Sequence, residues 1–292
     1  MFHKKRIEQK YQTSCMYASK LALPNMKNGS VRIINFQHIQ LPKLGSLRFK
    51  GISKKIFNRL DNIRIGTTTI SMDATGRYYV SMQLASEQPF VNKVNNETAT
   101  SIGIDLNIDN FLTDSEGKIV ANPRYYRSVK GTLAKAQRKL SRRALRAKKE
   151  HKPLSNAKNY QKQRKIANRR KNFLHLVSIT LIKKHDLVVA EELRSKNTLQ
   201  NHALAMSISD VGWRTLLGML AYKADLYGQK FITVNPRNTT QTCSACGFVM
   251  GTGTTNKLTL ADRDWTCPQC ETYHIRDHNA AKNILAKGIA SM

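Results

Sequence analysis

The amino-acid sequence predicts a mixed α/β protein with a shorter β-rich segment in front of it. In the later part of the chain, apolar runs of the length of buried strands alternate with longer segments of helical periodicity. In the earlier part, β-branched and aromatic residues instead alternate with polar residues around turn-forming ones. Two CxxC pairs near the end indicate a small metal-binding module set into the α/β part.

The β-rich segment covers residues 31–86. The run IQLPKLGSLRFKG places a proline-containing turn between two short strand-like runs. TTTISM and RYYVSMQLA flank the turn DATG at residues 73–76, which predicts a β-hairpin. Residues 86–101 are polar and poor in strand formers, as in a linker. We therefore expect the first domain to span residues 1–95.

Strands and helices alternate after this linker. SIGID, LVVAEEL and KFITVNP each contain a short apolar run typical of a buried strand, and a further strand follows SIGID. Two helices are expected within residues 126–185, separated at Pro153, because apolar residues recur there at three- and four-residue steps. A third helix is expected over residues 209–227 with Gly228 as its stop, and a closing helix over residues 279–287.

Basic residues strongly outnumber acidic ones. The chain has 49 Lys and Arg against 19 Asp and Glu, a formal net charge of +30 and a pI near 10.2. Such a surplus repels itself unless a polyanion neutralises it, so DNA or RNA is the expected partner. The alternative is that the excess of basic residues serves only to keep the protein soluble, but this does not account for the clustering of the charge.

The basic residues concentrate in the two helices predicted first. Residues 130–171 hold 17 Lys and Arg and a single acid, Glu150. Like charges at helical spacing destabilise a helix, and phosphate groups would offset that cost. We expect these helices to contact nucleic acid, with a merely solvated charged face as the simpler alternative. The residues expected to bind are Arg138, Lys139, Arg142, Arg143, Arg146, Arg164, Lys165, Arg169 and Arg170.

Neither a membrane span nor a secretory signal is expected. No run of about 18 apolar residues occurs, and no apolar segment follows the basic start of the chain. Four of the five cysteines form CxxC pairs, which indicates metal binding in a reducing compartment and not a disulfide framework. We therefore expect a cytoplasmic protein, associated with the nucleoid. Nothing in the sequence predicts its oligomeric state.

The two CxxC pairs lie in a module of residues 241–271, between an α/β core of residues 96–240 and its closing part, residues 272–292. The cysteines are Cys243, Cys246, Cys267 and Cys270. Four thiolates can hold one Zn²⁺ tetrahedrally and leave no open position, so a structural zinc is expected. Gly247 suits the tight turn after the first pair, and Trp265 is expected to pack over the site. A redox pair or a labile iron centre are the alternatives.

Three acids stand where apolar elements end or begin. Asp105 ends SIGID, Glu191 ends LVVAE with Glu192 beside it, and Asp277 opens the closing helix. Acids at such places are exposed but rigidly supported, and three together can hold two Mg²⁺ about 3.5–4 Å apart and hydrolyse a phosphodiester. Each acid alone is more simply a turn residue or a helix cap stabilised by the helix dipole.

Five motifs occur over roughly residues 38–290: GIDLNIDNF, VVAEEL, SISDVGWRTLLGMLAYKADLYG, CSACG with WTCPQC, and HIRDHNAAKNIL. They resemble, in the same order, motifs of the TnpB (OrfB) family of insertion-sequence proteins, which are related to the type V CRISPR effector nucleases. The resemblance implies a RuvC-like RNase H fold and an RNA-guided DNA endonuclease that cuts both strands, with a guide RNA encoded by the element.

The resemblance also implies roles for particular residues. Asp105, Glu191 and Asp277 match the three catalytic acids, the four cysteines match the zinc ligands, and the β-rich front matches the later part of a wedge β-barrel domain. Two departures accompany the match. EEL replaces the usual ED pair, so Glu192 stands beside the second acid. The chain is also expected to begin where the family's recognition helices end, which would make it an N-terminally truncated form.

Several functions remain open on the sequence alone. The first hypothesis is a DNA nuclease with two catalytic Mg²⁺ and one structural Zn²⁺. A non-cleaving RNA- or DNA-binding regulator is the second, although the presence of all three acids argues against it. A truncated remnant would expose unpaired strand edges and aggregate. A transposase in the strict sense ranks lowest, because no separate domain for binding element ends is apparent in the sequence.

Overall fold

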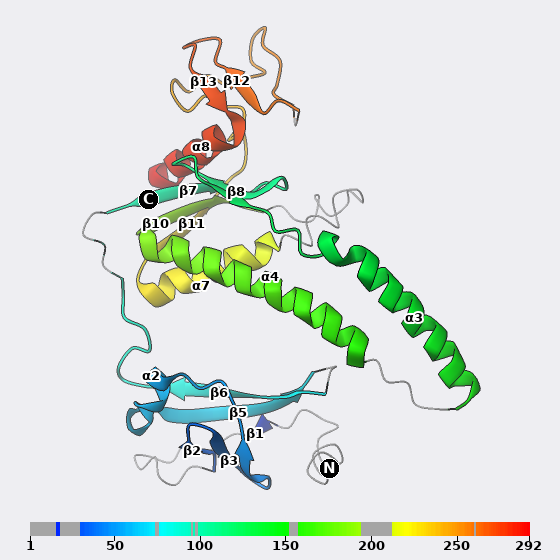
Figure 1. Cartoon of the computed structure of the whole chain (residues 1–292). Helices are drawn as coiled ribbons and strands as arrows, with labels where there is room; N and C mark the ends of the chain where they lie inside the picture. Colours follow the sequence, from blue (N-terminus) through cyan, green and yellow to red (C-terminus); the bar gives the residue numbers. More distant parts are fainter. Residues whose placement is uncertain are drawn as a thin grey trace. The chain divides into compact units, whose positions relative to one another are not determined.

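The computed structural model describes residues 16–17, 30–73, 76–94, 96, 99–151, 157–193, 212–259 and 261–292. These residues fall into two compact units, which are drawn in Figure 1. The N-terminal unit comprises the described residues within Met1–Phe90 and Ala147–Gln161, and the C-terminal unit comprises those within Val91–Arg146 and Lys162–Met292. In this part of the chain, no helix is both long and apolar enough to cross a membrane.

Two antiparallel sheets make up the N-terminal unit. Their strands are β2 (Arg32–Asn35), β3 (His38–Leu41) and β4 (Gly45–Arg48) in one sheet, and β1 (Met16–Tyr17), β5 (Arg64–Met72) and β6 (Tyr78–Ala85) in the other. The short helices α2 (Lys54–Phe57) and η2 (Leu60–Asn62) follow β4 in the sequence. The predicted hairpin is confirmed as β5–β6, in which Ile70 pairs with Val80. Residues 74–75 of its predicted turn lie outside the described residues.

Apolar side chains of both sheets share one core. Side chains alternate along a strand, so the sequence HIQL turns Ile39 and Leu41 of β3 to the same side. Both are buried, and Ile70 of β5 and Val80 of β6 pack against their cluster. The alternation that predicted strands in this segment is therefore also what builds its core.

A five-stranded sheet with the order β11-β10-β7-β8-β9 forms the centre of the C-terminal unit. Its strands are β7 (Ser101–Asp105), β8 (Asn110–Asp114), β9 (Ile119–Ala121), β10 (Leu187–Glu191) and β11 (Lys230–Val234). The strands β7, β10 and β11 run parallel, whereas β8 is antiparallel to β7 and β9 to β8. The prediction of a mixed α/β protein is confirmed.

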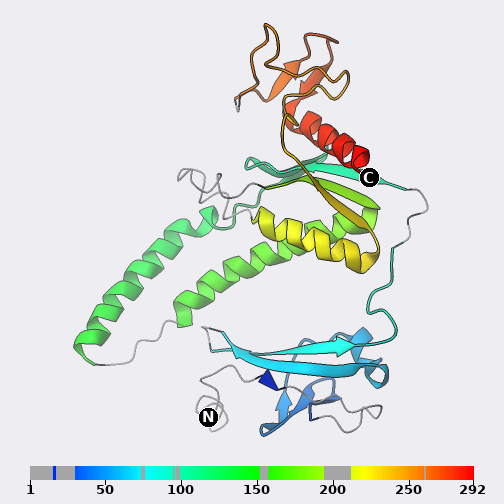
Figure 2. The same ribbon diagram turned by 180° about the vertical axis from the view of Figure 1, so that it is seen from behind.

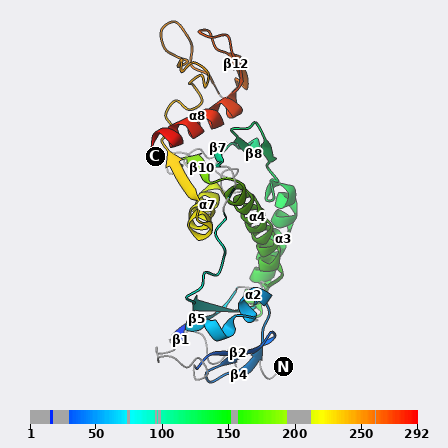
Figure 3. The same ribbon diagram turned by 90° about the vertical axis from the view of Figure 1, so that its left-hand side faces the viewer.

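Helices cover both faces of this sheet. They are α4 (Ala157–Lys184) and α7 (Trp213–Tyr227) on one face and α8 (Arg276–Ala290) on the other, as Figures 1 and 2 show. Figure 3 shows the sheet between α8 and the other two helices. Alternation along β10 serves both faces, because Val188 and Ala190 join the core with α4 and α7 while Val189 packs in the cluster that contains Ile284 of α8.

The helix α8 approaches β7 closely at one glycine. A Cβ atom at Gly103 would lie 2.2 Å from the carbonyl oxygen of Ala281 and 2.8 Å from the Cβ of Leu285. A residue with a side chain would therefore push the helix away from the strand. Glycine at this position sets the height of α8 above the strand that ends in Asp105.

The predicted helix boundaries were partly right. The helices α3 (Lys130–Lys149), which follows η3 (Arg127–Val129), and α4 confirm the two predicted basic helices. Pro153 lies outside the described residues, as do residues 209–211 of the predicted third helix. That helix, α7, ends at Gly228, whose φ of 77° confirms the predicted stop.

The predicted closing helix was too short. The prediction spanned residues 279–287, whereas α8 spans Arg276–Ala290. The helix begins directly after the strand β13 (Tyr273–Ile275), and no turn residue marks the change. Gly288 lies inside the helix because its lack of a side chain accommodates Val189 of β10, so it does not act as a stop.

Candidate metal centre and acidic site

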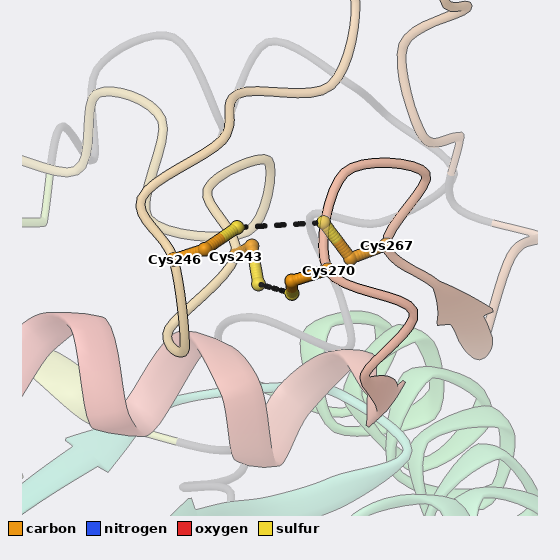
Figure 4. A group of neighbouring side chains, drawn as sticks. All are labelled: Cys243, Cys246, Cys267 and Cys270. Atoms are coloured by element: carbon orange, nitrogen blue, oxygen red, sulfur yellow. Dashed lines mark hydrogen bonds between the residues drawn. The ribbon is translucent and has the colours of Figure 1, made fainter.

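The four cysteines come together at two similar turns. The Sγ atoms of Cys243, Cys246, Cys267 and Cys270 all lie within 4.8 Å of one another. Figure 4 shows that Cys243 faces Cys270 and Cys246 faces Cys267. The Sγ atoms of the first pair are 3.7 Å apart and those of the second pair 3.6 Å apart. Metal–sulfur bonds of about 2.3 Å at a tetrahedral angle would place the sulfurs roughly 3.8 Å apart. The arrangement therefore fits a four-thiolate metal site.

The two turns have the same backbone construction. In the first, the amide of Gly247 donates to the carbonyl of Cys243 at 2.9 Å, and in the second the amide of Glu271 donates to the carbonyl of Cys267 at 2.9 Å. Both donors have a positive φ, 82° for Gly247 and 57° for Glu271. The prediction that Gly247 serves a tight turn is confirmed. Glu271 takes the equivalent conformation without being glycine, and no sequence signal indicated it.

An apolar shell surrounds the cysteines. Trp265 is buried in a cluster with Cys243 and Cys267, which confirms that it packs at the site. Its ring lies 4.8 Å from the ring of His274, centroid to centroid. The Nε2 atom of His274 lies 3.0 Å from the Sγ of Cys243. No sequence pattern indicated His274, which the hairpin of β12 (Asp264–Thr266) and β13 brings opposite Trp265.

Two asparagines of α8 hold the loop that leads into the first cysteine pair. Asn279 accepts from the amide of Ser244 at 2.9 Å and donates to the carbonyl of Thr242 at 2.7 Å. Asn283, one helical turn later, donates to the carbonyls of Thr239 at 2.9 Å and Thr242 at 2.6 Å. These bonds satisfy backbone polar atoms of a half-buried loop and attach the cysteine module to the helix that carries Asp277.

The three predicted acids meet at one edge of the sheet. Because β7 and β10 are parallel neighbours in which Ile104 pairs with Ala190, their last residues, Asp105 and Glu191, end side by side. Asp277 lies in the first turn of α8, which packs on β7. The charges of Glu191 and Asp277 both act on Asp105. The structure thus places Glu191 and Asp277 within electrostatic reach of Asp105, although among the described residues the four cysteines are the only group whose ligand atoms already lie close enough together to hold a metal ion.

Burial and like charges disfavour ionisation of Asp105. Its side chain is only 7% exposed. Burial, followed by the negative charges of Glu191 and Asp277, raises the pKa of Asp105 to about 8. A hydrogen bond from Asn107 and the positive charge of Arg276 act in the opposite direction. Asp105 therefore retains a proton near neutral pH unless a cation compensates for the surrounding negative charge.

Each of the other two acids has a partner that no sequence pattern predicted. Burial raises the pKa of Glu191, and the hydroxyl of Thr239, which donates to its Oε1, lowers it. Arg276 is buried and its Nη2 lies 3.2 Å from Oδ1 of Asp277. The same guanidinium donates through Nη1 to the carbonyl of Thr259 at 3.1 Å. Glu192, by contrast, is exposed to solvent.

The basic residues lie along two helices. One side of α3 carries a stripe of half-buried apolar residues, namely Leu133, Ala136, Leu140 and Ala144. The residues between them are exposed. The predicted nucleic-acid contacts that are exposed are Arg138, Lys139, Arg142, Arg143, Arg146, Lys165 and Arg169, and those that are half-buried are Arg164 and Arg170. The charged side chains of α3 thus face solvent along most of the helix.

Comparison with known proteins identifies relatives for most of the chain. Residues 81–202 match the family OrfB_IS605, described as "Probable transposase", and residues 213–284 match the Cas12f1-like TNB domain. A candidate RNA-guided DNA endonuclease of Streptomyces pristinaespiralis is 38% identical over 231 residues, which is 77% of this chain and 53% of that protein. The candidate RNA-guided DNA endonuclease InsQ of Escherichia coli K12 is 29% identical over 275 residues, 86% of this chain and 62% of that protein.

A solved structure shares the fold. The Cas12f1 chain in a cryo-EM structure with sgRNA and target DNA superimposes with a TM-score of 0.55 at 17% identity, over 80% of this chain and 48% of that one. The chain therefore spans about half the length of the first of these relatives and of this structure. The family matches and the relatives agree with the motifs and with the four-cysteine cluster, and they confirm the resemblance of this chain to the TnpB (OrfB) family.

Proposed function

We propose that this chain is an RNA-guided DNA endonuclease whose C-terminal unit hydrolyses phosphodiester bonds with two Mg²⁺ ions. Asp105, Glu191 and Asp277 are the proposed catalytic and magnesium-binding residues. One observation carries the proposal: three acids from three separate elements lie at one edge of the sheet, where burial and then the charges of Glu191 and Asp277 raise the pKa of Asp105 to about 8. Such a cluster is costly to ionise unless cations occupy it.

We propose a RuvC-like RNase H fold for this unit. A mixed sheet with helices on both faces supports it, as does the overall fold similarity to a Cas12f1 chain. The proposed domain division is a core of residues 96–240 and 272–292 with inserted basic helices, and a zinc ribbon of residues 241–271. Residues 1–95 are proposed to form part of a wedge β-barrel, which the two antiparallel sheets of the N-terminal unit support.

The donor set fits magnesium. Mg²⁺ prefers oxygen ligands, and every proposed ligand here is a carboxylate. When bound, two such ions supply an activated water and stabilise the leaving oxygen of the phosphodiester. Asp105 and Glu191 stand on adjacent strands and Asp277 on a helix packed against one of them, so their spacing does not depend on a long loop. Hydrolysis by this arrangement would leave a 3′-hydroxyl and a 5′-phosphate.

DNA is the proposed substrate, and an RNA encoded by the same element is the proposed guide. The relatives named as RNA-guided DNA endonucleases support both assignments. The net charge of +30 and the exposed basic side chains of α3 support contact with the phosphate backbone. Such contacts depend on salt and little on sequence, so the basic helices would position nucleic acid without reading it.

We propose that Cys243, Cys246, Cys267 and Cys270 hold one structural Zn²⁺. Sulfur separations of 3.6 and 3.7 Å support a tetrahedral thiolate site. Four protein ligands leave no position for a substrate, so the zinc would act on stability and on the position of neighbouring groups.

A cleavage assay with matched variants tests the nuclease function. The chain, expressed with its flanking element-end RNA and loaded with zinc, is mixed with a guide-matched plasmid library in Mg²⁺. We expect guide-dependent cutting that Asp105→Ala abolishes while nucleic-acid binding remains. Glu191→Ala should also abolish cutting, and Glu192→Ala is its control because this neighbouring acid is exposed.

The other outcomes separate the remaining hypotheses. Binding of RNA and DNA without cutting by the wild-type protein would favour a non-cleaving regulator. Loss of binding in step with loss of cutting in Asp105→Ala would contradict the assigned role of this acid. Joined products from substrates with marked element ends would instead indicate strand transfer, since the same two-metal chemistry accepts a hydroxyl nucleophile.

A further inference from the structure

Thr239 makes a contact that the nuclease proposal does not use. This residue lies in the loop that follows β11 and is only 1% exposed. Its Oγ1 donates to Oε1 of Glu191 and also lies 3.0 Å from the carbonyl oxygen of Pro236. A hydroxyl has one proton and can donate to one of these acceptors at a time. A carboxylate is the stronger acceptor, so the bond to Glu191 is favoured whenever Glu191 is ionised.

The loop places this hydroxyl rigidly. The side-chain amide of Asn283 donates to the carbonyls of Thr239 and Thr242, at 2.9 and 2.6 Å. Asn279 donates to the carbonyl of Thr242 at 2.7 Å. Both asparagines are buried and belong to α8, the helix whose first turn carries Asp277. The donor to the second acid is thus anchored to the element that bears the third.

We propose that Thr239 is a positioning residue for Glu191 in metal binding. Rotation about the last side-chain torsion of glutamate is only weakly restricted, so an unsupported carboxylate samples many orientations. The hydroxyl of Thr239 takes one lone pair of Oε1 and restricts this rotation, and the remaining lone pairs stay available for a cation. This inference rests on the proposed function, because it requires Glu191 to be a metal ligand.

A purely structural role for Thr239 makes a different prediction. If its hydroxyl served only to close the loop through the carbonyl of Pro236, its removal would lower stability and leave metal affinity unchanged. If Thr239 positions Glu191, removal of its hydroxyl should weaken metal binding more than it lowers stability. Replacing a residue that orients a metal ligand typically weakens metal binding about 10- to 100-fold.

The test is a titration with Mn²⁺, followed by the electron paramagnetic resonance signal of the free ion, on the zinc-loaded chain without nucleic acid. Thr239→Val removes the hydroxyl at nearly constant shape, and Thr239→Ser retains it. Thr242→Val is the matched control, because the hydroxyl of Thr242 lies in the same loop and donates to the carbonyl of Asn238 at 2.7 Å. Asp105→Ala identifies the Mn²⁺ that binds at the acids. Thermal melts and zinc content establish that each variant is folded.

We expect Thr239→Val to weaken Mn²⁺ binding at the acids about 10-fold or more, with Thr239→Ser and Thr242→Val close to wild type. Equal affinity in Thr239→Val and wild type would overturn the positioning role and leave the nuclease proposal intact. An equal loss in Thr242→Val would overturn it as well, since the loop as a whole would then be responsible. Wild-type protein with no Mn²⁺ sensitive to Asp105→Ala would overturn both proposals. Thr239→Ala replaces the valine variant if the latter does not melt cooperatively.

Discussion

Replacing Asp105 by asparagine should stabilise the protein in the absence of divalent cations, although it removes a proposed catalytic group. Asparagine is close to aspartate in shape but cannot ionise. In the folded protein, burial and the charges of Glu191 and Asp277 raise the pKa of Asp105 from an ordinary value of 3.8 to about 8. The folded state therefore binds more protons than the unfolded state between these two values, and the free energy of unfolding falls as pH rises through this window.

The size of the stability difference follows from the interval between the unfolded-state and folded-state pKa values of Asp105. Each pH unit between the unfolded-state pKa and the working pH corresponds to about 1.4 kcal/mol. At pH 7 the raised pKa of Asp105 lowers the free energy of unfolding by about 4 kcal/mol relative to a group that does not ionise. At pH 5 this loss falls to about 2 kcal/mol. An unmatched hydrogen bond of the new amide would offset about 1–2 kcal/mol. We therefore expect Asp105→Asn to be more stable than wild type by about 2–3 kcal/mol at pH 7.

Urea unfolding from pH 5 to pH 9 measures this difference. Trp213 and Trp265 are the two tryptophans of the chain and both belong to the C-terminal unit, so their fluorescence reports its unfolding. The stability difference should grow with pH and level off above about pH 8, and added Mg²⁺ should narrow it by stabilising the wild type. Glu192→Gln is the control for an exposed acid. A variant no more stable than wild type at pH 8 would refute the reasoning.

Three further outcomes follow from the structure. Wild-type protein should copurify with about one equivalent of zinc. Cys267→Ser should lose the zinc and melt about 4–8 °C lower, which corresponds to a loss of about 2 kcal/mol in the free energy of unfolding. Zinc-free protein that is fully folded would contradict this. Gly103→Ala should destabilise the C-terminal unit by about 3 kcal/mol because its Cβ would meet α8, whereas Gly218→Ala meets no atom within 4 Å and should stabilise by about 0.5–1 kcal/mol. Alanine at three α3 arginines should lower the slope of log affinity against log salt by about 0.9 for each duplex phosphate that no longer has a basic partner, as filter binding would measure. These arginines are Arg138, Arg142 and Arg146.

The sequence was informative wherever a local pattern determines the structure. Asp105 and Glu191 each close an apolar run, and an apolar run of that length is a buried strand whose last residue lies at the edge of the sheet. The cysteine pairs are equally local, because each CxxC makes its own turn. These local patterns do not determine which strands are neighbours in the sheet. The strand order, in which β10 lies between β7 and β11, depends on pairing between segments that are distant in the sequence.

The residues that support the acids could not be found in this way. Thr239 reaches Glu191 from 48 positions away, and it reads in the sequence as one more polar residue before the cysteines. Arg276 resembles the other basic residues of a strongly basic chain, yet it is buried beside Asp277. Asn283 looks like a polar position on a helix surface but is bound to two carbonyls of a loop. Each role arises from a tertiary contact, for which one sequence carries no periodic signal.

These contacts connect the cysteine module to the acids through α8. The asparagines of α8 hold the loop before Cys243, and Arg276 at its first turn donates to the carbonyls of Thr259 and Asp262, which lie between the two cysteine pairs. Asp277 follows Arg276 directly, and the same guanidinium contacts it. A displacement of the module would therefore move the carboxylate of Asp277, since both are fixed to one rigid helix. A zinc ion held by the four cysteines would therefore contribute to the chemistry proposed at the acids without binding substrate, because it would immobilise the loops that contact α8 and, through α8, Asp277.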